Sequence, residues 1–96
     1  MYALVLIRYR RPLEEVQQVT ARHREYLAQL QAAGLLLASG PLDPRSGGAL
    51  LLRVPDDDSA ALDRIRDDDP YWQAGLANYE LLPWQPGIGR EGLDTL

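Results

Sequence analysis

Cysteine and lysine are both absent from this 96-residue chain. The lack of cysteine excludes disulfides, thiol nucleophiles and cysteine-based metal sites, and the lack of lysine excludes Schiff-base chemistry. No apolar run approaches the roughly 18 residues of a membrane span. The first residues also lack the basic leader and cleavage site of a signal peptide, so we expect a cytoplasmic protein without membrane contact. A formal net charge of −4 argues against nucleic acid as a partner.

What the chain does contain is typical of one folded domain. Hydrophobic residues make up 46% of the chain and charged residues 25%, a balance that suits a globular protein. No internal repeat and no linker marks a second domain. We therefore expect one domain over residues 1–84 and a C-terminal tail over residues 85–96, a loose tail or an arm whose glycines and charges show no periodicity.

The pattern of apolar and turn residues predicts an α+β fold. Strands are expected at residues 2–9, 35–39, 49–54 and 76–84. Helices are expected over residues 12–33, after the N-terminal signal of residues 56–59, and for one turn after Asp69. Residues 40–48 are dense in turn formers and should be a loop. The resulting order, βαββαβ, predicts a ferredoxin-like antiparallel sheet with both helices on one face.

The two most apolar strands, residues 2–9 and 49–54, should form the central pair of this sheet. A sheet covered on one face alternates apolar with polar residues, but the segments 4–7 and 49–52 are apolar without alternation. A second copy of the chain is the expected cover for the other face. The sequence thus predicts a homodimer with the two sheets packed face to face.

His23 is the only histidine of the chain. It shares one face of the first predicted helix with apolar residues at steps of three and four: Val16, Val19, Tyr26, Leu27 and Leu30. A side chain that titrates near neutrality is therefore directed at the core or at a pocket. Two interpretations follow, a hydrogen-bonded core histidine and a catalytic one.

Three consecutive aspartates, residues 67–69, end the second predicted helix, where acids oppose the helix dipole. Asp67 and Asp68 are interpreted as solvent-exposed. Asp69 differs because Asp-Pro is a favourable pair of N-cap and first helical residue. As a cap, its carboxylate would be fixed by backbone N–H groups, and a fixed carboxylate is also suited to a functional role.

Other residues are candidates for lining a pocket. Arg8, at the end of the first strand, could hold an anionic substrate or simply be solvated. The loop at Gly40 lacks the lysine of a phosphate loop, but its backbone N–H groups could donate to a substrate oxygen. Tyr71 could be a wall residue or a dimer contact. One histidine with carboxylates makes a poor transition-metal site, and with no cofactor motif present we expect neither metal nor cofactor.

Three segments together resemble the YCII-related (YciI-like) family: residues 22–27 around His23, residues 38–42, and residues 69–75. The ending at Leu82-Pro83-Trp84 and Ile88-Gly89 is similar too, so the resemblance covers nearly the whole chain. It implies a ferredoxin-like unit that dimerises into an α+β barrel. It also implies a catalytic pair at His23 and Asp69 in a pocket shaped by Gly40 and Pro41; Ser39, Tyr71 and Arg8 complete the predicted substrate-binding set.

The resemblance also implies a class of activity. One branch of the family is a dehydrochlorinase, and the fold is similar to that of muconolactone isomerase-like enzymes. We therefore expect a cofactor-independent lyase or isomerase in which His23 and Asp69 perform acid–base chemistry on a small cyclic or aromatic metabolite. The alternatives are a non-catalytic module that binds a small molecule on the same dimeric scaffold, and a cofactor-independent monooxygenase.

Overall fold

The apolar run near the N-terminus forms a strand, as its composition predicts. In the computed structural model, which describes residues 1–96, the strands are β1 (Tyr2–Tyr9), β2 (Leu36–Pro41), β3 (Gly47–Arg53) and β4 (Ala77–Trp84). The helices are α1 (Leu13–Gln17), α2 (Thr20–Ala32), α3 (Ala61–Asp67), α4 (Pro70–Gln73) and α5 (Arg90–Asp94). None of these helices has the length and apolarity needed to cross a membrane.

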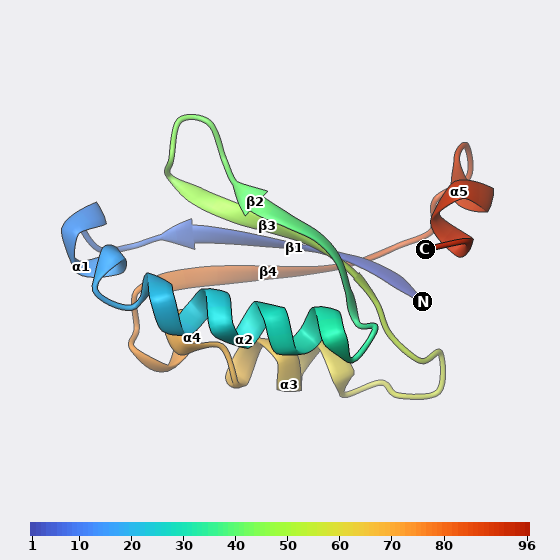
Figure 1. The fold of residues 1–96 in the computed structure, drawn as a ribbon, viewed down its shortest axis with the longest axis horizontal. Helices are drawn as coiled ribbons and strands as arrows, with labels where there is room; N and C mark the ends of the chain where they lie inside the picture. The colour runs from blue at the N-terminus through green and yellow to red at the C-terminus, as the bar shows by residue number, and fades with distance from the viewer.

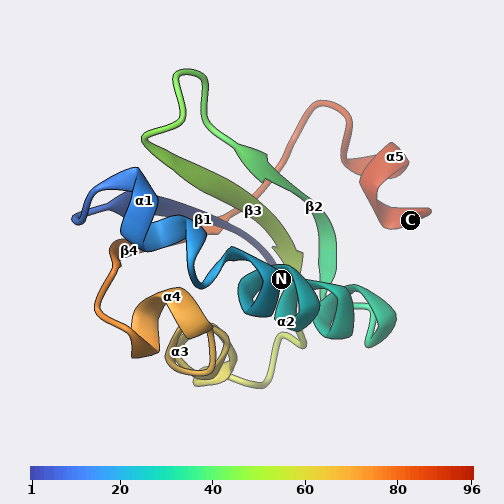
Figure 2. The same ribbon diagram turned by 60° about the vertical axis from the view of Figure 1, so that its left-hand side comes forward.

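The strands form one antiparallel sheet in the order β2-β3-β1-β4. This is the predicted ferredoxin-like arrangement, with β1 and β3 as the central pair. Helices α2, α3 and α4 cover one face of the sheet, and α5 lies apart from them near the end that holds both termini (Figures 1 and 2). The fold prediction is therefore confirmed at the level of class, topology and helix placement.

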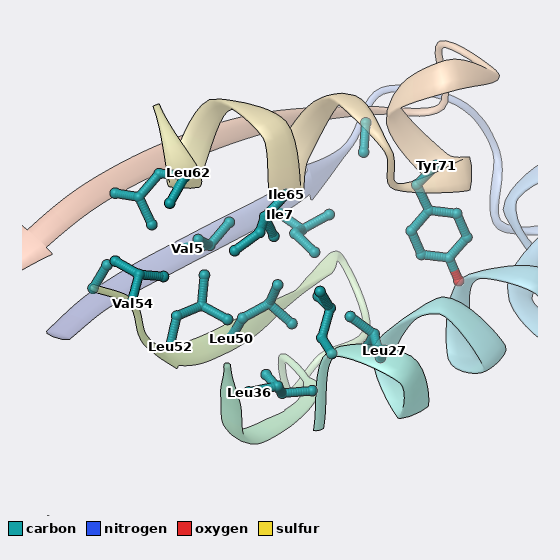
Figure 3. Close-up of a cluster of buried hydrophobic side chains, with 14 of the residues drawn as sticks. Val5, Ile7, Leu27, Leu36, Leu50, Leu52, Val54, Leu62, Ile65 and Tyr71 are labelled. Carbon is teal, nitrogen blue, oxygen red and sulfur yellow. The ribbon is translucent and has the colours of Figure 1, made fainter. Parts of the chain in front are cut away.

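The core lies between the sheet and helices α2 and α3. Alternation along β1 turns Ala3, Val5 and Ile7 toward the helices, and each of these residues is at most 2% exposed. Figure 3 shows how apolar side chains from both layers meet there: Val5, Ile7, Leu50 and Leu52 from the sheet, and Leu27, Leu62 and Ile65 from the helices. Burial of each such side chain stabilises the fold by roughly 1.5–3 kcal/mol.

The expected single helix over residues 12–33 is wrong, because the structure divides it into α1 and α2. Val19, between them, has φ −111°, far from the helical value, and its N–H bonds to the carbonyl of Val16 three residues back. The break allows Val16 and Val19 both to be buried.

The loop between the second and third strands is shorter than predicted. Gly40 and Pro41 pair with Ala49 and Gly48 in the sheet, so only residues 42–46 remain outside the strands. β2 is an edge strand, where a proline without an N–H is tolerated.

The helix start predicted at residues 56–59 is also wrong. Helix α3 begins at Ala61 and has no side-chain cap. Two of the three acids before it form ion pairs, Asp56 with the N-terminal amine and Asp58 with Arg64.

The C-terminal segment contains a short helix and contacts the first strand. Residues 90–94 form α5, which is tied to the start of β1 by a hydrogen bond of 2.5 Å from the Tyr2 hydroxyl to Asp94. The Arg53 guanidinium donates to the carbonyls of Leu93 and Leu96. The segment thus covers the end of the sheet next to the N-terminus.

The face of the sheet opposite the helices is apolar. Leu4, Leu6 and Leu51 lie there half-buried, and Leu82 and Trp84 are 37% and 39% exposed. β1 therefore has apolar residues on both faces, which explains the missing alternation in its sequence. The C-terminal segment contacts this surface only at its end, around Tyr2, and the rest, which we call the outer face, is not covered by the chain.

A close backbone approach at Gly47 gives the first testable prediction. A Cβ built on Gly47 would lie 1.8 Å from the Ile7 carbonyl oxygen, whereas one on Gly40 would meet nothing within 4 Å. Since backbone atoms of the central strand cannot easily move aside, we expect Gly47→Ala to lower the free energy of unfolding by about 2 kcal/mol or more. Gly40→Ala should change it little. Urea denaturation measures both, and equal effects would contradict the assigned register.

Candidate functional site

His23 lies on α2, on the side that faces the sheet. The turn at residues 18–19 leads into this helix, and the His23 N–H closes a helical bond of 3.0 Å to the Val19 carbonyl. The residue is 8% exposed. Its imidazole lies parallel to the Tyr71 ring, with centroids 3.9 Å apart and planes at 13°. The ring is therefore held in one orientation by stacking.

Asp69 meets His23 from a segment 46 positions further along the chain. It is the N-cap of α4, and its Oδ1 accepts the backbone N–H of Tyr71 at 3.0 Å. The same oxygen lies 2.8 Å from His23 Nδ1, and the side chain of Asp69 is 1% exposed. A cap and an imidazole contact are thus combined in one carboxylate; the Asp-Pro pair predicted the cap, and the family resemblance implied the contact with His23.

The hydrogen bond to Asp69 defines the two imidazole nitrogens. A carboxylate only accepts hydrogen bonds, so Nδ1 must carry the proton. Nε2 makes no hydrogen bond with the protein, and it is not among the buried unpartnered atoms. Because His23 lines a pocket, this second nitrogen is open to whatever occupies that pocket.

The other oxygen of Asp69, Oδ2, is buried without a hydrogen-bond partner, and so is the hydroxyl of Tyr79. Burial first, and then the neighbouring Asp69 carboxylate, raise the pKa of Tyr79 far above its usual value. Tyr79 therefore stays neutral and directs a polar group at the carboxylate from the β4 side. Tyr79 and the backbone of Tyr71 thus lie on two sides of Asp69.

Tyr71 connects the pair to the start of α2. Its hydroxyl lies 2.7 Å from Thr20 Oγ1, which itself bonds the Val16 carbonyl at 3.2 Å. Since Thr20 has one hydroxyl proton and uses it on Val16, Tyr71 is the donor to Thr20. Burial raises the pKa of Tyr71, which keeps this donor protonated. Figure 3 shows the Tyr71 ring extending from α4 toward α2.

The pocket in front of His23 has a volume of about 240 Å³ and lies between α2, β1 and the β2–β3 hairpin. Its walls combine apolar side chains with hydroxyls and two guanidinium groups. The lining residues are Ile7, Tyr9, Thr20, His23, Arg24, Leu27, Ser39, Gly40, Pro41, Arg45, Gly48, Ala49, Leu50 and Tyr71. The volume is below the range of pockets for drug-sized ligands and therefore suits a small molecule.

The structure brings together most of the residues selected from the sequence. Ser39, Gly40, Pro41 and Tyr71 all line the pocket beside His23. Ser39 faces it because of a register irregularity in β2: Leu36 pairs with Leu52, but Ala38 pairs with Leu51. The extra residue reverses the alternation, so that Ser39 lies opposite Leu50 on the helix-covered face.

Arg8 is the exception among the selected residues, because it does not line the pocket. It lies on the outer face, where its guanidinium is 3.7 Å from the Glu80 carboxylate, and its side chain is 60% exposed. Alternation explains the difference. Ile7 and Tyr9 face the helices, so Arg8 between them must face the other side. Arg8 is therefore left out of the site proposed below.

Four polar residues of the pocket were not selected from the sequence: Tyr9, Thr20, Arg24 and Arg45. Signals for two of them were present. Thr20 is one helical turn before His23, and Tyr9 is two residues after the apolar Ile7, so that both point to the same face of the strand. Arg45 lies in a loop whose path no local pattern specifies. No three histidine, aspartate or glutamate side chains are close enough together to hold a metal ion.

Fold and site together define a class, that of small ferredoxin-like α+β proteins with a histidine–aspartate pair beside a pocket. A family model described as the YCII-related domain matches residues 1–85. The chain therefore belongs to the YCII-related family, as its three sequence motifs predict. A search of curated proteins finds no match to the chain.

One solved structure similar to this chain is 5-chloro-2-hydroxyhydroquinone dehydrochlorinase (TftG) from Burkholderia phenoliruptrix AC1100, in complex with 2,5-dihydroxybenzoquinone. The two chains are 22% identical. The match covers 91% of this chain and 96% of the other, with a TM-score of 0.76. At this level of identity the similarity establishes a shared fold.

The double role of Asp69 gives the second prediction. Replacing Asp69 by Ala removes the cap of α4 and leaves the buried His23 Nδ1 without an acceptor, so we expect the free energy of unfolding to fall by about 2–4 kcal/mol. Asp68→Ala, one residue earlier and exposed, should change it by less than about 0.5 kcal/mol. Thermal or urea denaturation compares them. Equal losses would show that the buried contacts of Asp69 contribute little.

Proposed function

We propose that this chain is a cofactor-independent enzyme of the lyase or isomerase type, in which His23 transfers a proton and Asp69 orients it. One observation carries the proposal. Nδ1 of the only histidine is held by a buried carboxylate at 2.8 Å, while Nε2 has no protein partner and belongs to a side chain that lines a pocket. A histidine with a purely structural role would be expected to use both nitrogens in the core.

The geometry supports a separate role for each of His23, Asp69 and Tyr71. Asp69 accepts a hydrogen bond from the Nδ1–H group, which leaves the Nε2 lone pair directed at the pocket as a general base. When Nε2 takes a proton, the buried carboxylate stabilises the resulting imidazolium. Tyr71, stacked on the ring, keeps the imidazole from rotating away. This pair can remove a proton from a carbon next to a carbonyl, or from a phenolic oxygen.

Two outcomes of that proton transfer are open to a small cyclic substrate. In an elimination, the electron pair left by the proton expels a leaving group such as chloride, and Nε2 keeps the proton until solvent removes it. In an isomerisation, Nε2 returns the proton to another carbon of the same molecule. The TftG structure carries the name of a dehydrochlorinase, which favours the elimination as the first reaction to test.

The pocket walls supply what such a reaction needs besides the base. Ile7, Leu27 and Leu50 give apolar contacts for a ring. Ser39 places a hydroxyl at the same cavity. This hydroxyl can donate a hydrogen bond to an oxyanion that develops on the substrate. With these residues, His23, Asp69, Ser39, Gly40, Pro41 and Tyr71 form the proposed site.

We further propose that two copies of the chain associate through their outer faces. The support is the uncovered apolar surface of Leu4, Leu6 and Leu51 with the exposed Leu82 and Trp84. Contiguous apolar patches of this kind mark interaction sites, and a closed two-fold dimer buries the same patch on both copies.

The third prediction tests the proton transfer. In D2O, the wild-type protein should catalyse hydrogen–deuterium exchange at the acidic C–H of at least one member of a panel of small cyclic ketones, lactones and quinols, or release chloride from 5-chloro-2-hydroxyhydroquinone. His23→Asn should lower that rate by about 10²-fold or more, because it removes the base. NMR and chloride measurements give the rates.

A matched control separates catalysis from folding. Arg22→Gln, on an exposed position one residue earlier in α2, should retain the full rate, and circular dichroism should show that His23→Asn is folded. An unchanged rate in His23→Asn would contradict the proposal. Binding of a panel member without any turnover would instead support the non-catalytic module.

The fourth prediction concerns the dimer. Light scattering should give a molar mass of twice the 10.8 kDa of one chain. Leu82→Glu should reduce it to that of a monomer, since a charge would be buried in the interface. Leu13→Glu is the matched control: Leu13 on α1 is 36% exposed and Leu82 is 37% exposed. A wild-type monomer, or equal effects of the two substitutions, would exclude the outer face as the interface.

A further inference from the structure

The charge of the pocket is opposite in sign to that of the chain. The chain carries 14 acidic and 10 basic residues, yet no aspartate or glutamate lines the pocket in front of His23. The only lining side chains with a fixed charge are Arg24 and Arg45. A ligand in this cavity is therefore surrounded by positive charge and by hydroxyl donors.

Neither arginine has an anionic partner within the protein. The guanidinium groups of Arg8, Arg11, Arg64 and Arg66 form ion pairs with carboxylates. Arg24 and Arg45 form none, as is also true of four arginines outside the pocket. Two unpaired guanidinium groups on one small cavity do not stabilise the fold, since like charges placed together repel. They are better suited to binding an anionic ligand.

Arg45 is the better placed of the two for binding. Its loop is fixed by backbone hydrogen bonds on both sides, from the Tyr9 N–H to the Ser46 carbonyl at 3.0 Å and from the Leu42 N–H to the Gly47 carbonyl at 2.9 Å. Its guanidinium lies beside the phenol groups of Tyr9 and Tyr71, of which Tyr9 contributes most to raising the pKa of Arg45. Neither neighbour is an aspartate or a glutamate, so this guanidinium has no carboxylate partner in the pocket.

A continuous series of contacts joins Arg45 to the imidazole. The Tyr9 ring meets the Tyr71 ring edge-on at 5.9 Å and 82°, and the Tyr71 ring is stacked on His23 at 3.9 Å. The positive group and Nε2 therefore lie along one wall of the same cavity. A ligand held at one end by its charge would present its ring to the base at the other end.

We propose that Arg45, with the hydroxyl of Tyr9, forms an anion subsite that selects small cyclic or aromatic carboxylates as ligands of this pocket. The planar guanidinium matches a carboxylate with two parallel N–H donors. The apolar wall of Ile7, Leu27 and Leu50 then contacts the ring. This inference rests on the proposed function for the choice of the pocket, but binding through Arg45 does not require turnover.

Benzoate and its uncharged isostere benzamide are the probes for this subsite, added to the ¹⁵N-labelled full chain in an NMR titration. We expect the wild type to bind benzoate at least tenfold more tightly than benzamide. Arg45→Gln should weaken benzoate binding by about tenfold or more, since it removes a charged hydrogen bond to the carboxylate, and leave benzamide binding unchanged. Higher salt should weaken benzoate binding to the wild type.

Two control variants locate the effect. Arg22→Gln removes the same charge from an exposed position of α2 outside the pocket and should leave benzoate binding unchanged. Tyr9→Phe should weaken benzoate binding less than Arg45→Gln does. The proposal is overturned by equal affinities for the two probes, by full benzoate binding in Arg45→Gln, by a loss caused by Arg24→Gln alone, or by no saturable shift at millimolar benzoate.

His23→Asn distinguishes this inference from the proposed function. If the subsite is correct, His23→Asn still prefers benzoate over benzamide, whether or not the protein turns over any substrate. Loss of deuterium exchange without loss of benzoate binding supports both claims. Charge-dependent binding in a wild-type protein that catalyses no proton transfer would sustain the anion subsite and reject the enzyme.

Discussion

The hydrogen bond between His23 Nδ1 and Asp69 Oδ1 is the contact around which the site is arranged. It joins α2 to the start of α4 across 46 positions of sequence, and both residues are buried. The same carboxylate oxygen caps α4. Asp69 therefore fixes the start of this short helix, the orientation of Tyr71 and the position of the imidazole. Displacing Asp69 would alter all three together.

The rest of the fold places a cavity in front of that anchor. The alternation of β1 directs Ile7 and Tyr9 to the pocket side and Arg8 to the outer face. The close packing of Gly47 against the Ile7 carbonyl brings the β2–β3 hairpin over the end of β1, and the register irregularity in β2 turns Ser39 inward. The polar wall of the pocket thus depends on backbone features of the sheet.

Local patterns in the sequence were sufficient for the fold. Strand β1, the turn at Asp69–Pro70 and the order of elements follow from apolar runs and from Asp-Pro chemistry, because these signals act over a few residues. The break at Val19 was missed, since it depends on the need to bury Val16 and Val19 together. The glycines of residues 40–48 favoured a loop, but in the structure all three of them pair in the sheet, and at Gly47 the absence of a Cβ permits a close approach of the strands.

The site residues, too, divide into those that the sequence identifies and those that only the tertiary structure shows. His23 and Asp69 were identified because each departs from its local expectation, a polar residue on an apolar face and an acid at a helix C-terminus, and the family resemblance paired them. Arg8 was selected because it lies near a strand end, but the alternation of side chains along the strand directs it to the outer face. Arg45 could not be identified, since its side chain reaches the pocket only through the path of residues 42–46. Contacts of this kind are set by tertiary structure.

The most direct test of the account is the protonation state of each imidazole nitrogen of His23, and a chain with one histidine gives a single, unambiguous pair of ¹⁵N signals. At a pH where the imidazole is neutral, long-range ¹H–¹⁵N spectra should show a protonated Nδ1 and an unprotonated Nε2. Asp69→Ala should lose this single tautomer, because Nδ1 then has no acceptor. A wild-type histidine with its proton on Nε2 would contradict the central claim that Asp69 presents an open base to the pocket.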